Sequence, residues 1–211
     1  MKKIGLCFFI SCCAVSCYAQ QWEVGGAAGG SFLPGVSATG SVGSATAGFK
    51  TGPTFGGYFG QNLYNHLSGE VRYEFMKSDL RLSSGGTEAT FSGQAHLLHY
   101  DLIFHTNKAE ARTQFFAAIG GGIKVFQGTG KEQAYQPLSQ FGYFTRTRSL
   151  KPMASIGGGV KFALSEKIYM RVEARDFITM FPKEIITPAP GVKFGSLLHD
   201  IVPMIGISYE Y

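Results

Sequence analysis

Serine, histidine and carboxylate side chains are the groups in this sequence that could catalyse a hydrolysis. Such a reaction needs a nucleophile, a base that activates it and an acid that orients the base. The candidates are His96 or His199, combined with Asp200 and with either Ser92 or Ser196. The local histidine–serine signature of a deacylase is missing. We therefore expect no enzymatic activity and interpret these groups as hydrated residues at the edge of the fold.

The spacing of the histidines does not predict a metal site. The chain has five of them, His66, His96, His99, His105 and His199. His96 and His99 lie three apart in a strand-like segment and point to opposite faces, whereas His99 and His105 share a face about 20 Å apart at ~3.3 Å per residue. All four cysteines fall within the first 17 residues. We expect neither a metal nor a cofactor.

A glycine-rich near-repeat is the motif that could suggest phosphate binding. Ala117–Lys124 reads AAIGGGIK, and Ala154–Lys161 reads ASIGGGVK. Neither copy has the GxGxxG or GxxxxGK[ST] spacing that cradles phosphates, and neither opens a helix. Glycine in a strand permits a tightly curved wall and close packing of the side chains inside it. We interpret the copies as neighbouring strands of one curved sheet.

The first 19 residues have the pattern of a cleaved secretory signal peptide. Lys2 and Lys3 precede an apolar stretch at residues 4–15, and small residues precede a cleavage point after Ala19. Cleavage before Cys17, with lipidation of that cysteine, is the open alternative. The expected mature domain is residues 20–211. Loss of the two lysines lowers the formal net charge from +5 to +3, which is too little to predict a nucleic-acid partner.

Composition excludes two classes of protein. The 211 residues are 45% hydrophobic, 14% aromatic and only 16% charged, with 29 glycines. An aromatic content this high argues against a disordered chain. After residue 19 there is no run of about 18 apolar residues, so a bundle of membrane-spanning helices is excluded as well.

Eight segments of alternating apolar and polar residues follow the signal segment. A period of two is typical of β-strands, and a tilted strand of about 9–11 residues can cross a membrane. The segments are Gln21–Phe32, Ala47–Gly60, Leu67–Met76, Ser92–His105, Arg112–Phe126, Pro152–Leu164, Lys167–Phe177 and His199–Tyr211. In the second segment, Phe49, Phe55 and Phe59 are expected on the apolar face.

The connections between these segments alternate in length. Three are short, at residues 61–66, 106–111 and 165–166, and four are long, at residues 33–46, 77–91, 127–151 and 178–198. Short turns at one end and long loops at the other are the layout of an outer-membrane β-barrel, whose short turns are periplasmic. A soluble barrel of the lipocalin type, with its apolar residues inside, is the competing interpretation.

Charged residues on the polar face favour the membrane barrel. The predicted charge network consists of Glu70, Arg72, Glu74, Asp101, Lys124, Lys161, Arg171, Glu173 and Arg175. With Asp200 and Glu210 the face has five basic and six acidic groups, which nearly cancel. An arginine facing lipid would cost roughly 2–4 kcal/mol at the membrane midplane. We therefore predict an all-β, eight-stranded antiparallel up-and-down transmembrane barrel with its charges inside and its apolar residues outside.

The C-terminal residues resemble the insertion signal of bacterial outer-membrane proteins. In Met204–Tyr211 a glycine is followed three residues later by a hydrophobic residue and then by a terminal aromatic residue, at Gly206, Tyr209 and Tyr211. An extended final strand can pair with the assembly machinery by strand addition. Pro203 has no N–H to donate, so we expect it near the outer end of this strand.

Residues 20–211 as a whole resemble the small eight-stranded outer-membrane barrels. This family includes the transmembrane domain of outer-membrane protein A, outer-membrane protein X and the opacity-type proteins, and residues 69–75 and 171–177 are similar to its strands. The resemblance implies the outer membrane of a Gram-negative bacterium, with lipid or lipopolysaccharide around the barrel and the assembly machinery as a partner. It leaves the role open, because such folds serve as adhesins, anchors, defence proteins and a few lipid-modifying enzymes.

The long loops are the remaining functional surface. Residues 127–151 carry basic residues among aromatic ones, at Lys131, Arg146, Arg148 and Lys151. These residues either bind a surface ligand such as lipopolysaccharide phosphates, or sit beside lipid head groups where strands extend beyond the membrane. We predict a structural and surface-interaction role. The alternatives are a lipid-modifying enzyme acting at the barrel rim, and a narrow channel, which is disfavoured because eight strands leave room only for side chains.

Overall fold

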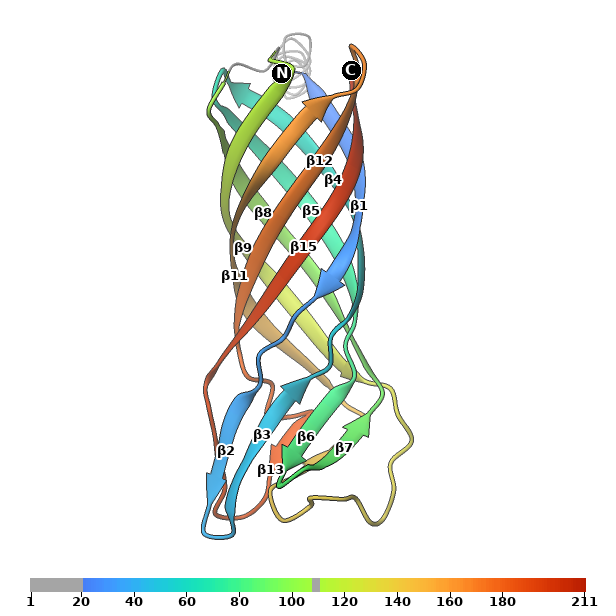
Figure 1. Cartoon of the computed structure of the whole chain (residues 1–211), viewed down its shortest axis with the longest axis vertical. Helices are drawn as coiled ribbons and strands as arrows, with labels where there is room; N and C mark the ends of the chain where they lie inside the picture. Colours follow the sequence, from blue (N-terminus) through green and yellow to red (C-terminus); the bar gives the residue numbers. More distant parts are fainter. Residues whose placement is uncertain (1–20, 108–110) are drawn as a thin grey trace, which may run out of the picture.

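The computed structural model describes residues 21–107 and 111–211, most of which form a closed barrel of eight antiparallel strands (Figure 1). The barrel strands are β1 (Trp22–Ser31), β4 (Gly52–Tyr64), β5 (Leu67–Lys77), β8 (Gly93–His105), β9 (Thr113–Gly128), β11 (Arg148–Ala163), β12 (Ile168–Met180) and β15 (Leu197–Glu210). Each strand pairs with its neighbour along the chain, and β1 pairs with β15 to close the barrel. The predicted fold class is confirmed. The predicted signal peptide lies outside the described residues.

Side chains alternate between the inside and the outside of the barrel. On β5, Val71 and Tyr73 are each 48% exposed, whereas Arg72 and Glu74 are buried. The same alternation continues around the barrel, and the outward side chains are mainly aliphatic and aromatic. This is the arrangement that a lipid-facing barrel requires and the reverse of that in a lipocalin-type barrel.

Seven short strands lie beyond the barrel at its long-loop end. Five of them form a second sheet, here called the loop sheet, in the order β14-β2-β3-β6-β7: β2 (Val36–Gly40), β3 (Gly43–Phe49), β6 (Leu80–Ser84), β7 (Thr87–Phe91) and β14 (Lys193–Phe194). The other two, β10 (Gly142–Phe144) and β13 (Ile186–Pro188), pair with each other. The sequence analysis predicted long connections here but not their strands, because strands this short and rich in serine, threonine, alanine and glycine do not stand out from loop composition. Among the described residues, no helix is long and apolar enough to span a membrane.

The predicted second barrel strand begins too early. Ala47–Phe49 belong to β3, and Phe49 is only 3% exposed instead of facing lipid. The chain leaves the loop sheet at Lys50, whose backbone N–H donates to the carbonyl of Asp79, and enters the barrel at Gly52. The error has a simple cause, because both strands alternate and their patterns run together across the short break.

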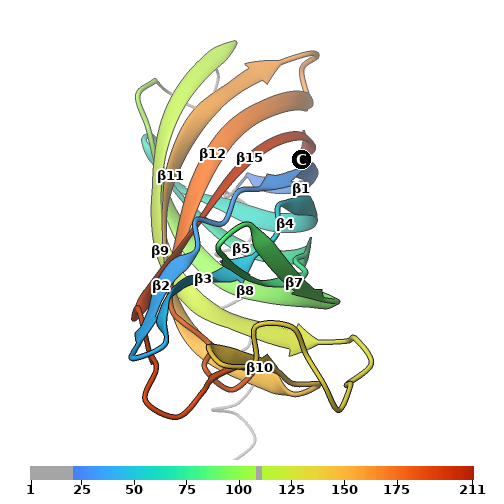
Figure 2. The same cartoon turned by 60° about the horizontal axis from the view of Figure 1, so that its bottom comes forward.

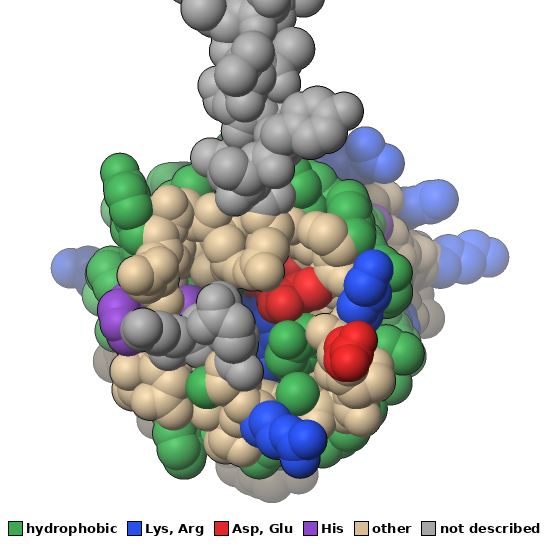
Figure 3. All heavy atoms as spheres, turned by 90° about the horizontal axis from the view of Figure 1, so that it is seen from above, with side chains coloured by type: hydrophobic (Ala, Val, Ile, Leu, Met, Phe, Trp, Pro, Cys, Tyr) green, Lys and Arg blue, Asp and Glu red, His purple; other side chains and the backbone are tan. Residues whose placement is uncertain are grey.

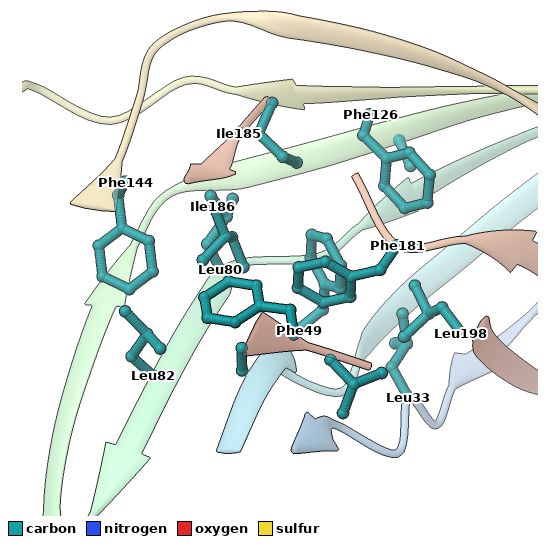
Figure 4. Close-up of a cluster of buried hydrophobic side chains, with 14 of the residues drawn as sticks. Leu33, Phe49, Leu80, Leu82, Phe126, Phe144, Phe181, Ile185, Ile186 and Leu198 are labelled. Atoms are coloured by element: carbon teal, nitrogen blue, oxygen red, sulfur yellow. The ribbon is translucent and has the colours of Figure 1, made fainter. Parts of the chain in front are cut away.

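One hydrophobic core joins the loop sheet to the barrel. Figure 4 shows Phe49 and Leu80 of the loop sheet near Phe126 and Leu198 of the barrel, with Phe181 among them. Further inward-facing barrel residues belong to the same cluster, namely Ala95, Leu97, Met153, Phe177, Val202 and Met204. The half of the lumen nearest the long loops is therefore filled with apolar side chains. Full burial of each large one stabilises the fold by roughly 1.5–3 kcal/mol.

Candidate functional site

The other half of the lumen holds a network of buried ion pairs. Arg72 of β5 donates to three carboxylates, with nitrogen–oxygen distances of 2.8 Å to Glu70, 3.3 Å to Glu74 and 2.5 Å to Glu173. All four side chains are at most 2% exposed. Arg72 therefore joins β5 to β12 across the lumen.

Two arginines of β12 complete this central network. Arg171 donates to Glu70 at 2.6 Å, and Arg175 donates to the same carboxylate at 3.3 Å. Arg175 also donates to Glu173 and to Asp101, and the ring of His99 lies 3.0 Å from Asp101. Three guanidinium groups thus face four carboxylates, and each arginine bridges strands that are far apart in sequence.

Two smaller groups of charges flank the central network. Lys161 of β11 donates to Glu23 at 2.8 Å and to Glu210, close to the short-turn end. Lys124 donates to Asp200 beside the apolar half of the lumen. Figure 3, which looks into the short-turn end, shows acidic and basic side chains within a rim of hydrophobic ones. Seven of the nine predicted residues belong to the central network, whereas Lys124 and Lys161 lie in the two flanking groups.

Sequence reasoning missed Glu23 in this network. Val24 and Gly26 are exposed on the outer face of β1, so Glu23 falls on the inward face by alternation. That signal was sufficient to find it. The pairing of Glu23 with Lys161 was not predictable, because the two residues are 138 positions apart in the sequence.

The glycine near-repeat makes room for these charges. Ala117–Lys124 lies in β9 and Ala154–Lys161 in β11, and the two segments pair as neighbours. A Cβ on Gly120 would lie 2.1 Å from an Asp101 oxygen, and one on Gly157 would lie 2.9 Å from Cγ of Arg175. The same Cβ atoms would lie 2.1 Å from the Tyr100 carbonyl oxygen and 2.6 Å from the Ala174 carbonyl oxygen, so neither position has room for a side chain.

The candidate hydrolytic groups do not come together. Asp200 points inward to Lys124, whereas His199 points outward and its Nδ1 lies 2.8 Å from Asp176. His96 is also on the outer wall, where its Nδ1 lies 2.8 Å from the Tyr73 hydroxyl. Asp200 and His199 are separated because consecutive strand residues face opposite sides of the wall. Within the described part of the chain, no cluster of three metal-binding side chains occurs.

The four basic residues predicted as loop contacts in residues 127–151 have different surroundings. Lys151 donates to Glu184 at 2.7 Å, so it is not free for a ligand. This hydrogen bond, together with one from Ser149, holds the pKa of the Glu184 carboxyl below its ordinary value. Lys131, Arg146 and Arg148 are exposed. The aromatic residues divide as well, because Tyr135 and Tyr143 are exposed while Phe141 and Phe144 belong to the hydrophobic core.

The C-terminal strand closes the barrel. Tyr211 and Trp22 exchange two backbone hydrogen bonds, and the rings of Tyr209 and Tyr211 stack 6.1 Å apart. Gly206 faces inward. Pro203 lies in the middle of β15, not near its outer end as expected, but it is where the continuous β1–β15 ladder stops. The missing N–H interrupts the ladder, and pairing resumes where Phe32 and Ile201 exchange two backbone hydrogen bonds.

Comparison with known proteins gives the fold and no close relative. No protein family and no curated protein matches the chain. Among solved structures, the chain is similar to OprG from Pseudomonas aeruginosa (TM-score 0.57, 11% identity, covering 91% of this chain and 95% of that one). It is also similar to a major outer membrane protein from Thermus thermophilus (0.55, 14%, 92% and 100%) and to Neisserial surface protein A (0.52, 11%, 90% and 97%).

The chain has the fold of the small outer-membrane β-barrels. This confirms the resemblance stated from the sequence. In such barrels the short turns face the periplasm and the long loops face the cell exterior. The loop sheet lies at the long-loop end of the barrel, and the central charge network lies in the half of the lumen nearer the short turns.

Proposed function

We propose that this protein is a closed outer-membrane anchor that presents its loop sheet outside the cell as a surface for binding a partner. The observation that carries the proposal is the hydrophobic core that continues from the barrel lumen into the loop sheet. Loops without such a core would be mobile, and ordering them on binding would reduce affinity. A sheet packed on the barrel is ordered before a partner arrives.

The side chains exposed at this end suit a binding surface. Tyr135 is 80% exposed, Val42 57% and Tyr143 42%. Arg146 and Arg148 are exposed nearby in sequence. Tyrosine and arginine are enriched in protein interfaces, because each combines a large contact area with polar groups. The predicted loop contacts Lys131, Arg146 and Arg148 thus remain candidates, whereas Lys151 is held by Glu184.

We expect trypsin added to intact cells to cut after Lys131 or Arg146 and not after Arg81. The first two lie outside strands, whereas Arg81 lies within β6, whose backbone pairs on both sides. The fragments can be sized by mass spectrometry of the outer-membrane fraction. Cleavage only after the cells are lysed would place these loops in the periplasm and overturn the proposal.

A channel is the second function to test, and we expect the lumen not to conduct. The central network fills one half of the lumen, and the apolar core fills the other half. Purified folded protein in planar bilayers should show no steady conductance of the general-porin kind. Large, long-lived openings that survive controls for porin contamination would show that the lumen opens.

A further inference from the structure

The outer edge of β7 lines an extracellular groove of about 390 Å³. One wall is the consecutive stretch Glu88–Ser92, and the other is formed by Gly130, Lys131, Gln133, Gln136, Pro137 and Phe144. Consecutive strand residues point alternately to the two faces of a sheet. Because all five residues line the groove, it runs along the backbone edge of β7. Figure 2 shows β7 at the margin of the loop sheet.

The peptide groups of this edge have a defined direction. Gly85 and Gly86 form a two-residue turn between β6 and β7, and both have positive φ (55° and 82°), as a type I′ hairpin requires. In such a hairpin the flanking pair exchanges hydrogen bonds, and every second residue then turns its N–H and C=O away from its partner strand. Glu88 and Thr90 therefore direct their peptide groups into the groove. In the described chain no hydrogen bond to these groups is found.

The chain itself begins to pair with this edge and then leaves it. The carbonyl of Ser92 accepts hydrogen bonds from the backbone N–H groups of Thr129 (2.8 Å) and Gly130 (3.1 Å). Beyond Gly130 the loop moves away and becomes the opposite wall. That wall is held in place, because Gln136 makes two hydrogen bonds to the backbone of Phe144. The space left beside Glu88 and Thr90 is where a further strand would continue this row of backbone hydrogen bonds.

The two faces of the edge differ in chemistry. Ala89 and Phe91 are buried, and the ring of Phe91 stacks on Phe144 at 5.8 Å. The opposite face is polar and exposed, and there Glu88 is paired with Lys50 at 2.9 Å and lies 3.9 Å from Arg81. Among the residues that line the groove, Lys131 is basic and Glu88 is acidic, and Lys50 and Arg81 lie beside Glu88 without lining it.

We propose that this groove binds an extended segment of another protein in which apolar and acidic residues alternate. The segment adds a strand to β7, so that its backbone pairs with Glu88 and Thr90. Its apolar side chains then lie beside Phe91, and its acidic side chains lie on the basic face. Strand addition takes its affinity from main-chain hydrogen bonds and its specificity from alternate side chains.

This inference rests on the proposed function, since the groove must be outside the cell to meet a foreign partner. A second copy of the chain is a poorer occupant. Two identical β7 edges would bring the same excess of basic groups, Lys50, Arg81 and Lys131, toward one another, and like charges across a strand pair are destabilising.

The test uses the full-length folded protein in detergent and a fluorescent eight-residue peptide that alternates valine and glutamate. We expect saturable binding by fluorescence anisotropy, and binding at least about tenfold weaker for the matching valine–lysine peptide. Thr90→Pro removes the N–H that faces the groove without removing a bond to β6, and should weaken binding about tenfold. Thr90→Ala keeps the backbone and should bind within about twofold of the parent protein.

Folding of each variant is checked by its heat-modifiable gel mobility, so that a loss of binding is read only from folded barrels. Equal affinity of Thr90→Pro and Thr90→Ala, or no preference for the acidic peptide, would overturn the proposal. A dimer of the parent protein that Thr90→Pro abolishes, without any competition from the peptide, would make a second copy the occupant and overturn it too. None of these outcomes alters the trypsin result. A failure of the strand-addition proposal is therefore distinguishable from a failure of the proposed function.

Discussion

A chain that lacks Tyr209–Tyr211 should be secreted but should not insert into the outer membrane. The deletion removes the two backbone hydrogen bonds between Tyr211 and Trp22, which begin the β1–β15 seam. It also removes the partner Glu210 of Lys161, and it removes the stacked Tyr209 and Tyr211 from the membrane interface at the short-turn end of the barrel. Aromatic residues favour that interface because the ring contacts lipid while the hydroxyl contacts water. The truncated chain should accumulate in the periplasm or be degraded.

The measurement compares the truncated and full-length chains by their yield in the membrane fraction and by heat-modifiable gel mobility. The double variant Tyr209→Phe/Tyr211→Phe is the matched control, because it keeps the backbone pairing and the aromatic rings. It should insert nearly as well as the parent chain. Equal yields of folded barrel from the truncated and full-length chains would show that the C-terminal motif is not an insertion signal here.

The barrel was predictable from the sequence because its wall obeys one local rule. Lipid outside and a packed lumen inside force a period of two, and strands such as β5 carry it without interruption. The loop sheet escaped prediction because its stability is not local. Its short strands are fixed by packing on residues such as Phe126 and Leu198, which come from distant parts of the chain.

The candidate site was predictable only in part, for the same reason. Alternation identifies which side chains point inward, and it placed Arg72 and Glu173 in the lumen. It cannot say that these two residues meet, since they are 101 positions apart. Alternation also cannot distinguish an apolar residue that fills the lumen, such as Phe177, from an apolar residue of the turn that follows the strand. The His199–Asp176 pair was missed because it joins two strands on the outer wall.

Replacing Arg72 by methionine should destabilise the barrel by about 3–5 kcal/mol, the range expected when one partner of a buried ion pair is removed. Methionine fills a similar volume, so the effect measures charge more than packing. Most of the lost stability is expected to arise at Glu74, which is fully buried. Arg72 is the residue with which Glu74 forms its ion pair among the described residues. Urea unfolding in lipid vesicles, followed by gel mobility, gives the free energy of unfolding.

Two further variants separate this effect from a general sensitivity to charge. Lys77→Ala removes an exposed pair with Asp79 and a hydrogen bond to the Gly93 carbonyl at the end of the same strand. Because both side chains are more than one third exposed, the change should cost at most about 1 kcal/mol. Adding Glu74→Gln to the Arg72→Met variant removes the carboxylate left without a partner. The double variant should therefore be more stable than the sum of the two single effects predicts, by about 0.5–3 kcal/mol. Strictly additive changes in the free energy of unfolding would mean that Arg72 and Glu74 do not interact. The lumen would then tolerate an unpaired carboxylate because Arg171 and Arg175 rearrange around it.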